Sequence, residues 1–522
     1  MVRFLAEYAE KAKYAIVPRP QYISIIDEIG MKKSMPAAPD QFEWYVNPDL
    51  GQAPLVFIGL GPEPEKIPEW FDLPSTGTFY YVENPAFTDQ AGDNWEQRVP
   101  ANFTRLTPDQ FSGDIARLSH VARYLPAQRA FPSFFAPLTA RLILPADLPS
   151  CKSKTVWLPH TEDDLLGKEL AFAFRKKGFT VNFIDHEALG KHPGAALPEL
   201  LSEGIPDLFF SVNFKGFDHF GLGFHILREA GVDVAVWLVD NPFNVLPGVK
   251  SVFWKDAKLF VTDHTFIGPL TETGAKWVKH LPLAASPKHF SEAGKLPPHG
   301  HDLKDKLVFV GRSEFPAREK FFARATVPAS LRKEVSEATE ATRFDYHWWR
   351  SQQPEVPLWP GNDVRNIGAG AEFAGRRWKI VCLESASPIT VFGDDGWKEI
   401  ENANVRPQVD YYAHLPAIYR TAAATLNITG MQLPAGLTQR HFDVWCAGGF
   451  LLTDANPGLA IFPDELVKEI SFDTPDEIPA IFERFRDDSP EKEKLRNAWQ
   501  ELVLREHTYE NRIDTVLESL GL

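Results

Sequence analysis

The chain has 522 residues, 44% of them hydrophobic and 12% aromatic, a composition that excludes global disorder. Its 55 basic and 70 acidic residues give a net charge of −15, which argues against nucleic acid and anionic membrane as partners, since both require basic surface. Residues 1–11 are too charged for a signal peptide, and no window of about 18 uncharged apolar residues occurs. We therefore expect a cytoplasmic protein without integral membrane association, with domains of roughly 150 residues.

Residues 1–148 are predicted to form a separate α/β module. An apolar strand runs into the turn Gly59-Leu-Gly61, and a second strand ends at Glu83. A strand, a Gly-x-Gly turn and an acid are typical of dinucleotide-binding units. However, the third glycine is missing, and the acids that follow Pro62 would lie where a phosphate should bind. We favour a structural βαβ unit and keep a nucleotide site as the alternative.

Residues 149–303 are predicted to form a Rossmann-like domain, because short apolar strands alternate with helices. The strands are expected at 155–159, 180–185, 206–213, 234–240, 257–263 and 277–283. Ligands bind beyond the carboxyl ends of such strands. Four polar residues there are candidates for the acceptor side of a site: Asn213, Asp240, Asn241 and Asp263. For Asp240-Asn241-Pro242, an Asx-Pro turn is an equally good explanation.

A polar stretch over 287–305 is the predicted linker to a second Rossmann-like domain at 304–488. Its strands are expected at 306–311, 388–393, 424–428 and 450–453, and residues 316–350 are expected to be helical. Ser489-Pro-Glu is a start signal for a long helix over 489–522. The predicted fold class is α/β, with two doubly wound Rossmann-like domains and an additional N-terminal α/β module.

The segment from Gly436 to Asp454 carries the strongest functional pattern. The loop Gly436-Leu437-Thr438 precedes a short helix on which Arg440 and Asp443 share one face. Loop amides and the helix dipole favour an anionic ligand, so these residues are predicted to bind a phosphorylated donor. An exposed ion pair between Arg440 and Asp443 is the alternative.

Further donor-side candidates follow other strands of this domain. Gly311 lets a backbone approach a ligand, and Arg312 and Arg318 could neutralise a diphosphate, unless they are simply solvated at a helix start. Asn427 ends a strand that should face the same cleft, and we favour a site role over a turn cap. Gly393 joins the donor-side candidates, although we interpret Gly393-Asp-Asp-Gly396 as a turn rather than a metal-binding acid pair.

Several segments occur in an order typical of one family: 236–242, 261–263, 280–285, 426–428, 440–443, 447–453 and 507–512. Over roughly residues 150–520 the chain resembles the CgeB-like (spore maturation protein) glycosyltransferases. The resemblance implies a GT-B fold of two Rossmann domains, with the last helix packing back on the N-terminal half. It also implies sugar transfer from a nucleotide-sugar donor, with retention of configuration and with no metal or other cofactor.

In related retaining transferases, an acid at the position of Asp443 holds the donor ribose. A second acid is expected eight residues earlier, where this chain has Ala435. We take Asp240, Arg318 and Asn427 as the catalytic candidates. The acceptor stays open among flagellin, another surface protein, a surface glycan and a small molecule. Two other functions also stay open: a non-catalytic nucleotide-sugar-binding or scaffold protein, and a two-Rossmann sugar-nucleotide epimerase.

Overall fold

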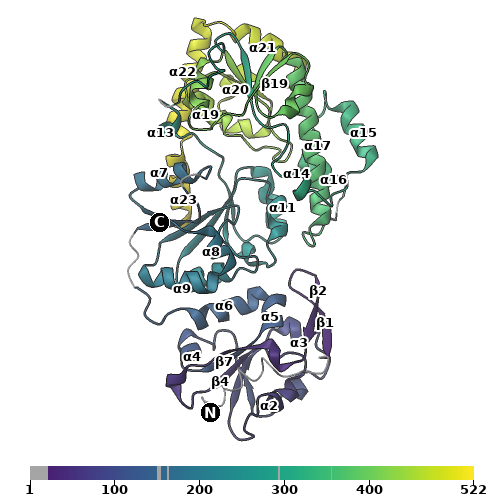
Figure 1. Ribbon diagram of the computed structural model, residues 1–522, viewed down its shortest axis with the longest axis vertical. Coiled ribbons are helices and arrows are strands. Elements are labelled where there is room, and N and C mark those ends of the chain that lie inside the picture. The colour runs from purple at the N-terminus through teal and green to yellow at the C-terminus, as the bar shows by residue number, and fades with distance from the viewer. Residues whose placement is uncertain (1–20, 150–153, 162–163, 292–293, 354) are drawn as a thin grey trace. The chain divides into compact units, whose positions relative to one another are not determined.

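The computed structural model describes residues 21–149, 154–161, 164–291, 294–353 and 355–522 (Figure 1). Two compact units divide the chain. The first holds the described residues up to His160, together with Asn182–Ala235 and Gly248–Ala257. The second holds Thr161–Val181, Val236–Pro247 and Lys258–Leu522.

The N-terminal part contains a five-stranded mixed sheet in the order β3-β7-β4-β5-β6. Its strands are β3 (Phe42–Tyr45), β4 (Leu55–Ile58), β5 (Phe79–Val82), β6 (Phe103–Arg105) and β7 (His120–Tyr124). β4 pairs in parallel with β5 and β7, and β3 is antiparallel to β7. A hairpin of β1 (Tyr22–Ile26) and β2 (Lys32–Pro36) precedes the sheet. The helices of this part are α2 (Ile67–Trp70), α3 (Pro85–Thr88), α4 (Gly113–Arg117), α5 (Leu125–Ala130) and α6 (Pro132–Ile143).

The Gly59-Leu-Gly61 turn of this module is packed against protein. A Cβ added at Gly59 or Gly61 would lie 3.2 Å from atoms of Tyr124. The Trp95 Nε1–H donates to the Gly61 carbonyl at 2.8 Å, and Glu83 accepts the Leu60 N–H at 2.8 Å. These contacts give the two glycines and the acid a structural explanation, in line with the interpretation favoured from the sequence.

A second sheet has six strands in the order β13-β12-β11-β10-β8-β9. The strands are β8 (Thr155–Leu158), β9 (Thr180–Phe183), β10 (Leu208–Val212), β11 (Asp233–Leu238), β12 (Lys258–Val261) and β13 (Val278–His280). All of β8 and β10 is buried, as expected of parallel strands covered on both faces. The associated helices are α7 (Gly167–Lys176), α8 (His186–Lys191), α9 (Pro193–Glu203), α10 (Leu222–Glu229), α11 (Pro242–Val245) and α12 (Ile267–Glu272).

A third sheet, also of six strands, has the order β16-β15-β14-β17-β18-β19, and its pairs are parallel. Its strands are β14 (Leu307–Val310), β15 (Ile389–Phe392), β16 (Ala403–Arg406), β17 (Ala424–Asn427), β18 (Leu451–Asp454) and β19 (Ser471–Phe472). The predicted fold class is confirmed: the protein is α/β, with two parallel six-stranded sheets and an N-terminal mixed sheet.

Helices around the third sheet depart from the sequence prediction in places. The expected helix over 316–350 is three helices: Ala317, with a positive φ of 56°, precedes the first, Pro328 precedes the second, and Asp345 caps the third. The predicted linker contains α13, and the C-terminal helix is broken at His507, where Thr508 caps a new one. The helices are α13 (Pro287–Phe290), α14 (Arg318–Phe321), α15 (Ala329–Ala338), α16 (Tyr346–Ser351), α17 (Asn362–Ser385), α18 (Leu415–Thr421), α19 (Arg440–Cys446), α20 (Asp464–Ile470), α21 (Ile478–Phe485), α22 (Pro490–Glu506) and α23 (Tyr509–Leu520).

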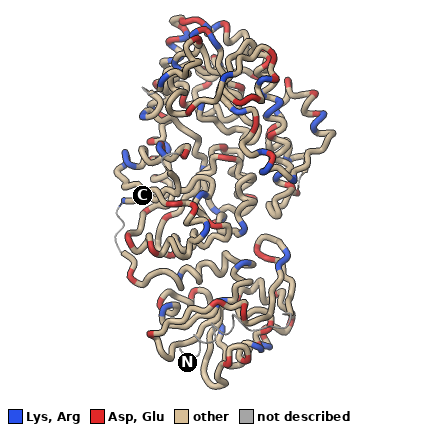
Figure 2. The backbone as a smooth tube through the Cα atoms, viewed as in Figure 1, with Lys and Arg blue, Asp and Glu red and all other residues tan. Residues whose placement is uncertain are grey.

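Charged residues of both signs are distributed along the described chain. Figure 2 shows acidic and basic residues interspersed along the backbone. Among the described residues, no helix is both long and apolar enough to cross a membrane. The same residues contain no cluster of three or more His, Cys, Asp or Glu suited to a metal ion.

Candidate functional site

The order of the strands in the third sheet reverses between β14 and β17. Counted along the chain, its strand order is 3-2-1-4-5-6. In open parallel sheets, ligands bind beyond the carboxyl ends of the strands at such a reversal. The loop that follows β17 and leads into α19 begins at that point. This loop is therefore the centre of the candidate donor site.

Asn427, the last residue of β17, is the hub of this loop. Its side chain is fully buried. Its Oδ1 accepts the Thr438 hydroxyl and the Arg440 Nε–H, each at 2.8 Å, and its Nδ2 donates to Thr453 Oγ1 at 3.0 Å. The side-chain amide of Asn427 thus binds the loop at Thr438, helix α19 at Arg440 and strand β18 at Thr453.

Arg440 reaches back from α19 to β14. One guanidinium N–H donates to the Val310 carbonyl at 2.7 Å, and the guanidinium lies 5.6 Å from the centroid of the Phe309 ring. Burial lowers the pKa of Arg440 from its ordinary value. Its hydrogen bonds go to Val310 and Asn427 rather than to Asp443, so the exposed ion pair considered as the alternative is not what the structure shows.

Asp443 faces the interior rather than solvent. It is 1% exposed, and its carboxylate accepts the hydroxyl of Tyr411. Burial raises the pKa of Asp443 well above its ordinary value, and the Tyr411 hydrogen bond offsets only part of that rise. The carboxylate is therefore desolvated and costly to keep ionised.

His441 contacts the loop at Thr438, and it was not among the predicted site residues. Its Nδ1 accepts the Thr438 N–H at 3.0 Å, and its Nε2 lies 3.0 Å from Thr453 Oγ1. Burial lowers the pKa of His441 to about 4, so the ring is neutral at pH 7. The spacing Arg440-His-Phe-Asp443 contained this residue but gave no signal that it contacts Thr438.

Asp454, the last residue of β18, binds the segment at Thr429 that follows β17. It accepts the Thr429 N–H at 2.9 Å and the Trp378 Nε1–H at 3.0 Å, and it pairs with Arg343. Burial alone would raise the pKa of Asp454, but Arg343 and these hydrogen bonds outweigh it and lower the pKa. Asp454 is thus a buried ionised group with its partners in place.

The loop offers unused backbone donors. Within the part of the chain that the structure describes, no acceptor is found for the backbone N–H groups of Leu437, Gln439 and Arg440. Buried or partly buried N–H groups normally have partners. These amides could therefore hold an anionic ligand next to Gly436 and Thr438.

Two of the predicted acceptor-side residues contact this same loop. Asn241 Nδ2 donates to the Gln432 carbonyl at 2.8 Å, and Asp263 Oδ2 accepts the Ala435 N–H at 2.8 Å. Both side chains are almost completely buried. The backbone of Ala435 is therefore in contact with the carboxylate of Asp263.

The other two acceptor-side candidates lie at strand ends as expected. Asp240 follows β11 and is exposed. Asn213 follows β10, has a positive φ of 52°, and belongs to the first compact unit, whereas Asp240 belongs to the second.

Gly311 and Gly393 bring two strand ends together. A Cβ on Gly393 would collide with the Gly311 carbonyl, which also accepts the Trp397 Nε1–H at 2.9 Å. Asp394 accepts the Ser313 N–H at 2.9 Å. The segment expected to be a turn leads into a 3-10 helix, Asp395–Glu399, capped by Asp394, and Gly393 is required by close approach of backbone.

The two arginines after β14 are not hydrogen-bonded to this hub. Arg312 is exposed. Arg318 begins α14 and lines a hollow of 260 Å³ with Arg376 and Arg377. A third cation, Lys379 of α17, was missed from the sequence: burial lowers its pKa, and Asp394 and Arg440 lie near enough to affect it.

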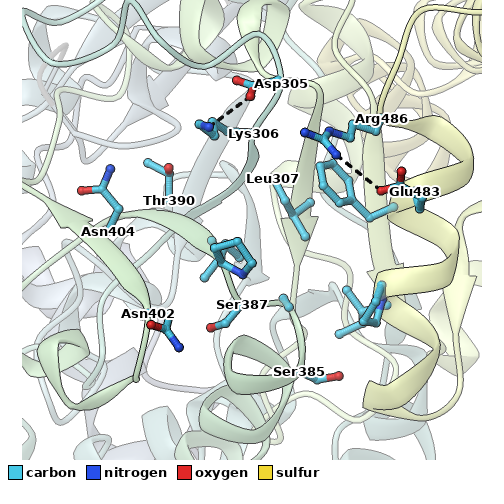
Figure 3. A pocket seen from close by; sticks show the side chains of 16 residues that line it. Asp305, Lys306, Leu307, Ser385, Ser387, Thr390, Asn402, Asn404, Glu483 and Arg486 are labelled. Atoms are coloured by element: carbon cyan, nitrogen blue, oxygen red, sulfur yellow. Dashed lines mark hydrogen bonds and ion pairs between the residues drawn. The ribbon is translucent and has the colours of Figure 1, made fainter.

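Two larger hollows lie at the opposite ends of the strands. One of 420 Å³ is lined by Leu307 and Thr390, at or near the starts of β14 and β15, and by Asn404 of β16 (Figure 3). Another of 550 Å³ contains Ala423 and Phe450, just before β17 and β18. Neither is at the carboxyl ends, where ligands of such sheets bind.

Comparison with known proteins assigns part of the chain. Residues 376–518 match the family model described as glycosyl transferase-like. No curated protein matches the sequence. Among solved structures, similarity is found to the UDP-forming α,α-trehalose-phosphate synthase from Burkholderia xenovorans, at 10% identity over 71% of this chain and 99% of that one, with a TM-score of 0.38.

Two further solved structures give similar values. The Anabaena protein HepE in complex with UDP and glucose is 10% identical over 70% of this chain and 99% of that one, with a TM-score of 0.38. T4 phage BGT in complex with UDP-glucose is 9% identical over the same shares, also with a TM-score of 0.38. From its family-model match, the chain contains, over residues 376–518, a segment similar to glycosyl transferase-like domains.

Proposed function

We propose that the protein is a glycosyltransferase that moves a sugar from a nucleotide-sugar donor to an acceptor. The family match over residues 376–518 carries this proposal, because the matched segment includes β17, the loop after it and α19. The CgeB-like resemblance, retention of configuration and a cytoplasmic setting belong to the same proposal.

The donor diphosphate would bind to the loop after β17. The amides of Leu437, Gln439 and Arg440 and the guanidinium of Arg440 supply hydrogen-bond donors at one place. Arg312 and Arg318, which follow β14, would add charge from the adjacent strand end. Such preorganised donors stabilise the negative charge that develops on the leaving diphosphate.

Asp443 would accept hydrogen bonds from the donor ribose. In the structure its carboxylate accepts the Tyr411 hydroxyl. A ribose hydroxyl would therefore share or replace this bond, so that the buried carboxylate stays partnered when the nucleotide is bound.

Among the catalytic candidates, Asn427 would act through its neighbours. It is fully buried and bonded to Thr438 and Arg440, so we propose it as a positioning residue for the loop. Arg318 remains a candidate for direct contact with the diphosphate, and Asp240 remains a candidate for contact with the acceptor.

On the acceptor side, Asn241 and Asp263 would shape the loop, and Asp240 and Asn213 are each kept as candidates for contact with the acceptor. A surface protein such as flagellin, a surface glycan and a small molecule fit this proposal equally. Deprotonation of the acceptor would be assisted by oxygens of the donor phosphate. We propose a metal-independent reaction, because the predicted phosphate-binding groups are amides and arginines, which suit oxyanions rather than cations.

The test is a thermal-shift screen of UDP, ADP, GDP and dTDP, each with EDTA and with Mn²⁺, since a ligand of the native state raises its melting temperature. We expect one nucleoside diphosphate to stabilise the protein in EDTA. The corresponding nucleotide sugar should then be hydrolysed slowly without acceptor.

Each alternative has its own outcome. Binding without any hydrolysis or transfer would indicate a scaffold or binding protein, and interconversion of free nucleotide sugars would indicate an epimerase. A strict requirement for Mn²⁺ would overturn the metal-independent mechanism, and no binding of any nucleotide would overturn the proposed function.

A further inference from the structure

A buried polar cluster adjoins Asp443, and the side chains of Glu169, Tyr412, Gln439 and Tyr509 in it have no role in the donor site described so far. It joins α7, the segment before α18, α19 and α23 within the second compact unit. Tyr412 donates its hydroxyl to Glu169 Oε1 at 2.8 Å, and Gln439 Nε2 donates to the hydroxyl of Tyr509 at 2.6 Å. Tyr411, whose ring centroid is 4.8 Å from that of Tyr412, donates to Asp443. Two consecutive tyrosines therefore hold two carboxyl groups.

Two oxygens in this cluster are buried without a partner. Glu169 is 1% exposed, and among the described residues neither Glu169 Oε2 nor Gln439 Oε1 has a hydrogen-bond partner of normal geometry. An unsatisfied buried acceptor costs about 1–3 kcal/mol, and more when it is charged. Native proteins seldom leave such groups without a protein, water or ligand partner.

The protein offers little to satisfy Glu169. Burial raises its pKa, and the favourable groups nearby, including its own backbone N–H and that of Leu166, offset only part of this rise. The ammonium of Lys168 lies over the Tyr412 ring, 4.8 Å from its centroid. The carboxyl group thus has one good hydrogen bond and one open acceptor.

The two unpartnered oxygens, Glu169 Oε2 and Gln439 Oε1, determine which chemical groups could bind here. With Glu169 ionised, both unpartnered atoms are acceptors, so the partner must present O–H or N–H groups. A phosphate does not suit this place, because it would add negative charge beside Glu169 and Asp443. The hydroxyl groups of a ribose and the N–H groups of a nucleobase both meet the requirement.

We propose that Glu169 and Gln439 form a subsite that binds hydrogen-bond donor groups of the nucleoside part of the donor. The proposal rests on the proposed function, in which Asp443 binds the ribose. The location supports the nucleoside over the transferred sugar. Tyr412 binds Glu169, and the adjacent Tyr411 binds Asp443, which is the proposed ribose-binding residue. Glu169 is then a binding residue contributed by α7, outside the segment 376–518.

The test compares nucleotide binding by wild type and Glu169→Gln, measured calorimetrically with UDP and GDP in EDTA. In this variant the side-chain oxygen can still accept from Tyr412, while the amide NH₂ replaces the open acceptor by a donor. We expect the affinity for the nucleotide that wild type binds to fall at least about tenfold. The melting temperature of the free variant should stay equal or rise, because a neutral amide replaces a carboxyl group whose ionised form is costly to bury.

Two controls and a second variant keep the result interpretable. Glu501→Gln, at an exposed position of α22, should leave affinity unchanged. Tyr412→Phe keeps Oε2 as an acceptor and should reduce affinity less than Glu169→Gln. If Glu169→Gln is unstable, Gln439→Leu removes the other open acceptor and should give the same loss of affinity.

The 2′-deoxy and 3′-deoxy nucleotides separate the two sources of donor groups. If ribose hydroxyls bind Glu169, wild type should prefer the ribonucleotide and Glu169→Gln should lose that preference. If the base binds, the preference between UDP and GDP should change instead. If folded Glu169→Gln and folded Gln439→Leu both bind the nucleotide within twofold of wild type, this inference is overturned and the proposed function stands. Absence of nucleotide binding by wild type would overturn both.

Discussion

Replacing Asn427 by Ala should release the loop after β17. The change removes the acceptor for the Thr438 hydroxyl and the Arg440 Nε–H, and the donor to Thr453. A neutral hydrogen bond contributes about 1 kcal/mol net, and one to a charged group about 1.5–3 kcal/mol. The three together amount to about 3.5–5 kcal/mol, an upper value because neighbouring side chains will relax.

Hydrogen–deuterium exchange of residues 432–443 measures this effect locally. Since about 1.4 kcal/mol corresponds to a tenfold change in an equilibrium constant, exchange through local opening should accelerate by at most about two and a half to three and a half powers of ten. Nucleotide affinity should fall with it, because Thr438 and Arg440 lose their positions.

Asn427→Asp is the matched control for this experiment. It keeps an acceptor for Thr438 and Arg440 and loses the Nδ2 donor that faces Thr453 Oγ1 and His441 Nε2, so its effect on exchange should be smaller. Unchanged exchange in Asn427→Ala would refute the reasoning that this side chain holds the loop.

Three further changes test other parts of the site. Asp443→Asn should lower nucleotide affinity. Because burial raises the pKa of Asp443 in the folded state, its contribution to stability falls as pH rises from about 4. The melting temperature of the variant minus that of wild type should therefore grow with pH; parallel pH curves would contradict this. Burial lowers the pKa of His441 from 6.5 to about 4, so wild type should lose at most about 3 kcal/mol of stability as pH falls through that range. His441→Gln should not show this loss. Urea unfolding at pH 7 and pH 5 measures it, and an unchanged pH dependence would count against it. Gly393→Ala should destabilise by about 1–3 kcal/mol through collision with the Gly311 carbonyl. Gly430→Ala is its control, because a Cβ there has no neighbour within 4 Å, and equal effects of the two would show that the close approach is not decisive.

Apolar runs predicted most strands of the two six-stranded sheets, because a parallel strand buried on both faces needs them. The long helix α17 was not predicted. It contains Gly368, Gly370 and Gly375, and glycine disfavours helix interiors. Tertiary contacts explain two of them: a Cβ on Gly370 would collide with the Trp349 ring, and one on Gly368 would lie 2.5 Å from Asn244 Oδ1. Such packing constraints are not visible in local sequence.

For the site, local pattern predicted the loop and its residue types but not their environment. The spacing of Arg440 and Asp443 correctly indicated a helix, yet it suggested an exposed face. Tyr411, 32 residues earlier in the chain, covers Asp443, and Glu169 is more distant still. Contacts between such separate segments depend on the order of strands in the sheet, which periodicity and composition do not specify.

The contacts of Asn241 and Asp263 change what a polar residue at a strand end means in this protein. Both were expected to face an acceptor, but their side chains hold the backbone of the loop at Gln432 and Ala435. A carboxylate that accepts a backbone N–H positions that segment without touching a ligand. Because the loop is held at these two points and again at Asn427, the amides of Leu437, Gln439 and Arg440, which have no acceptor among the described residues, can keep their direction before a ligand binds. Preorganisation of this kind lowers the cost of binding and of stabilising charge. Asp240 is exposed and directly precedes Asn241 in the chain, so a group bound at Asp240 would lie one residue from a side chain that holds this loop.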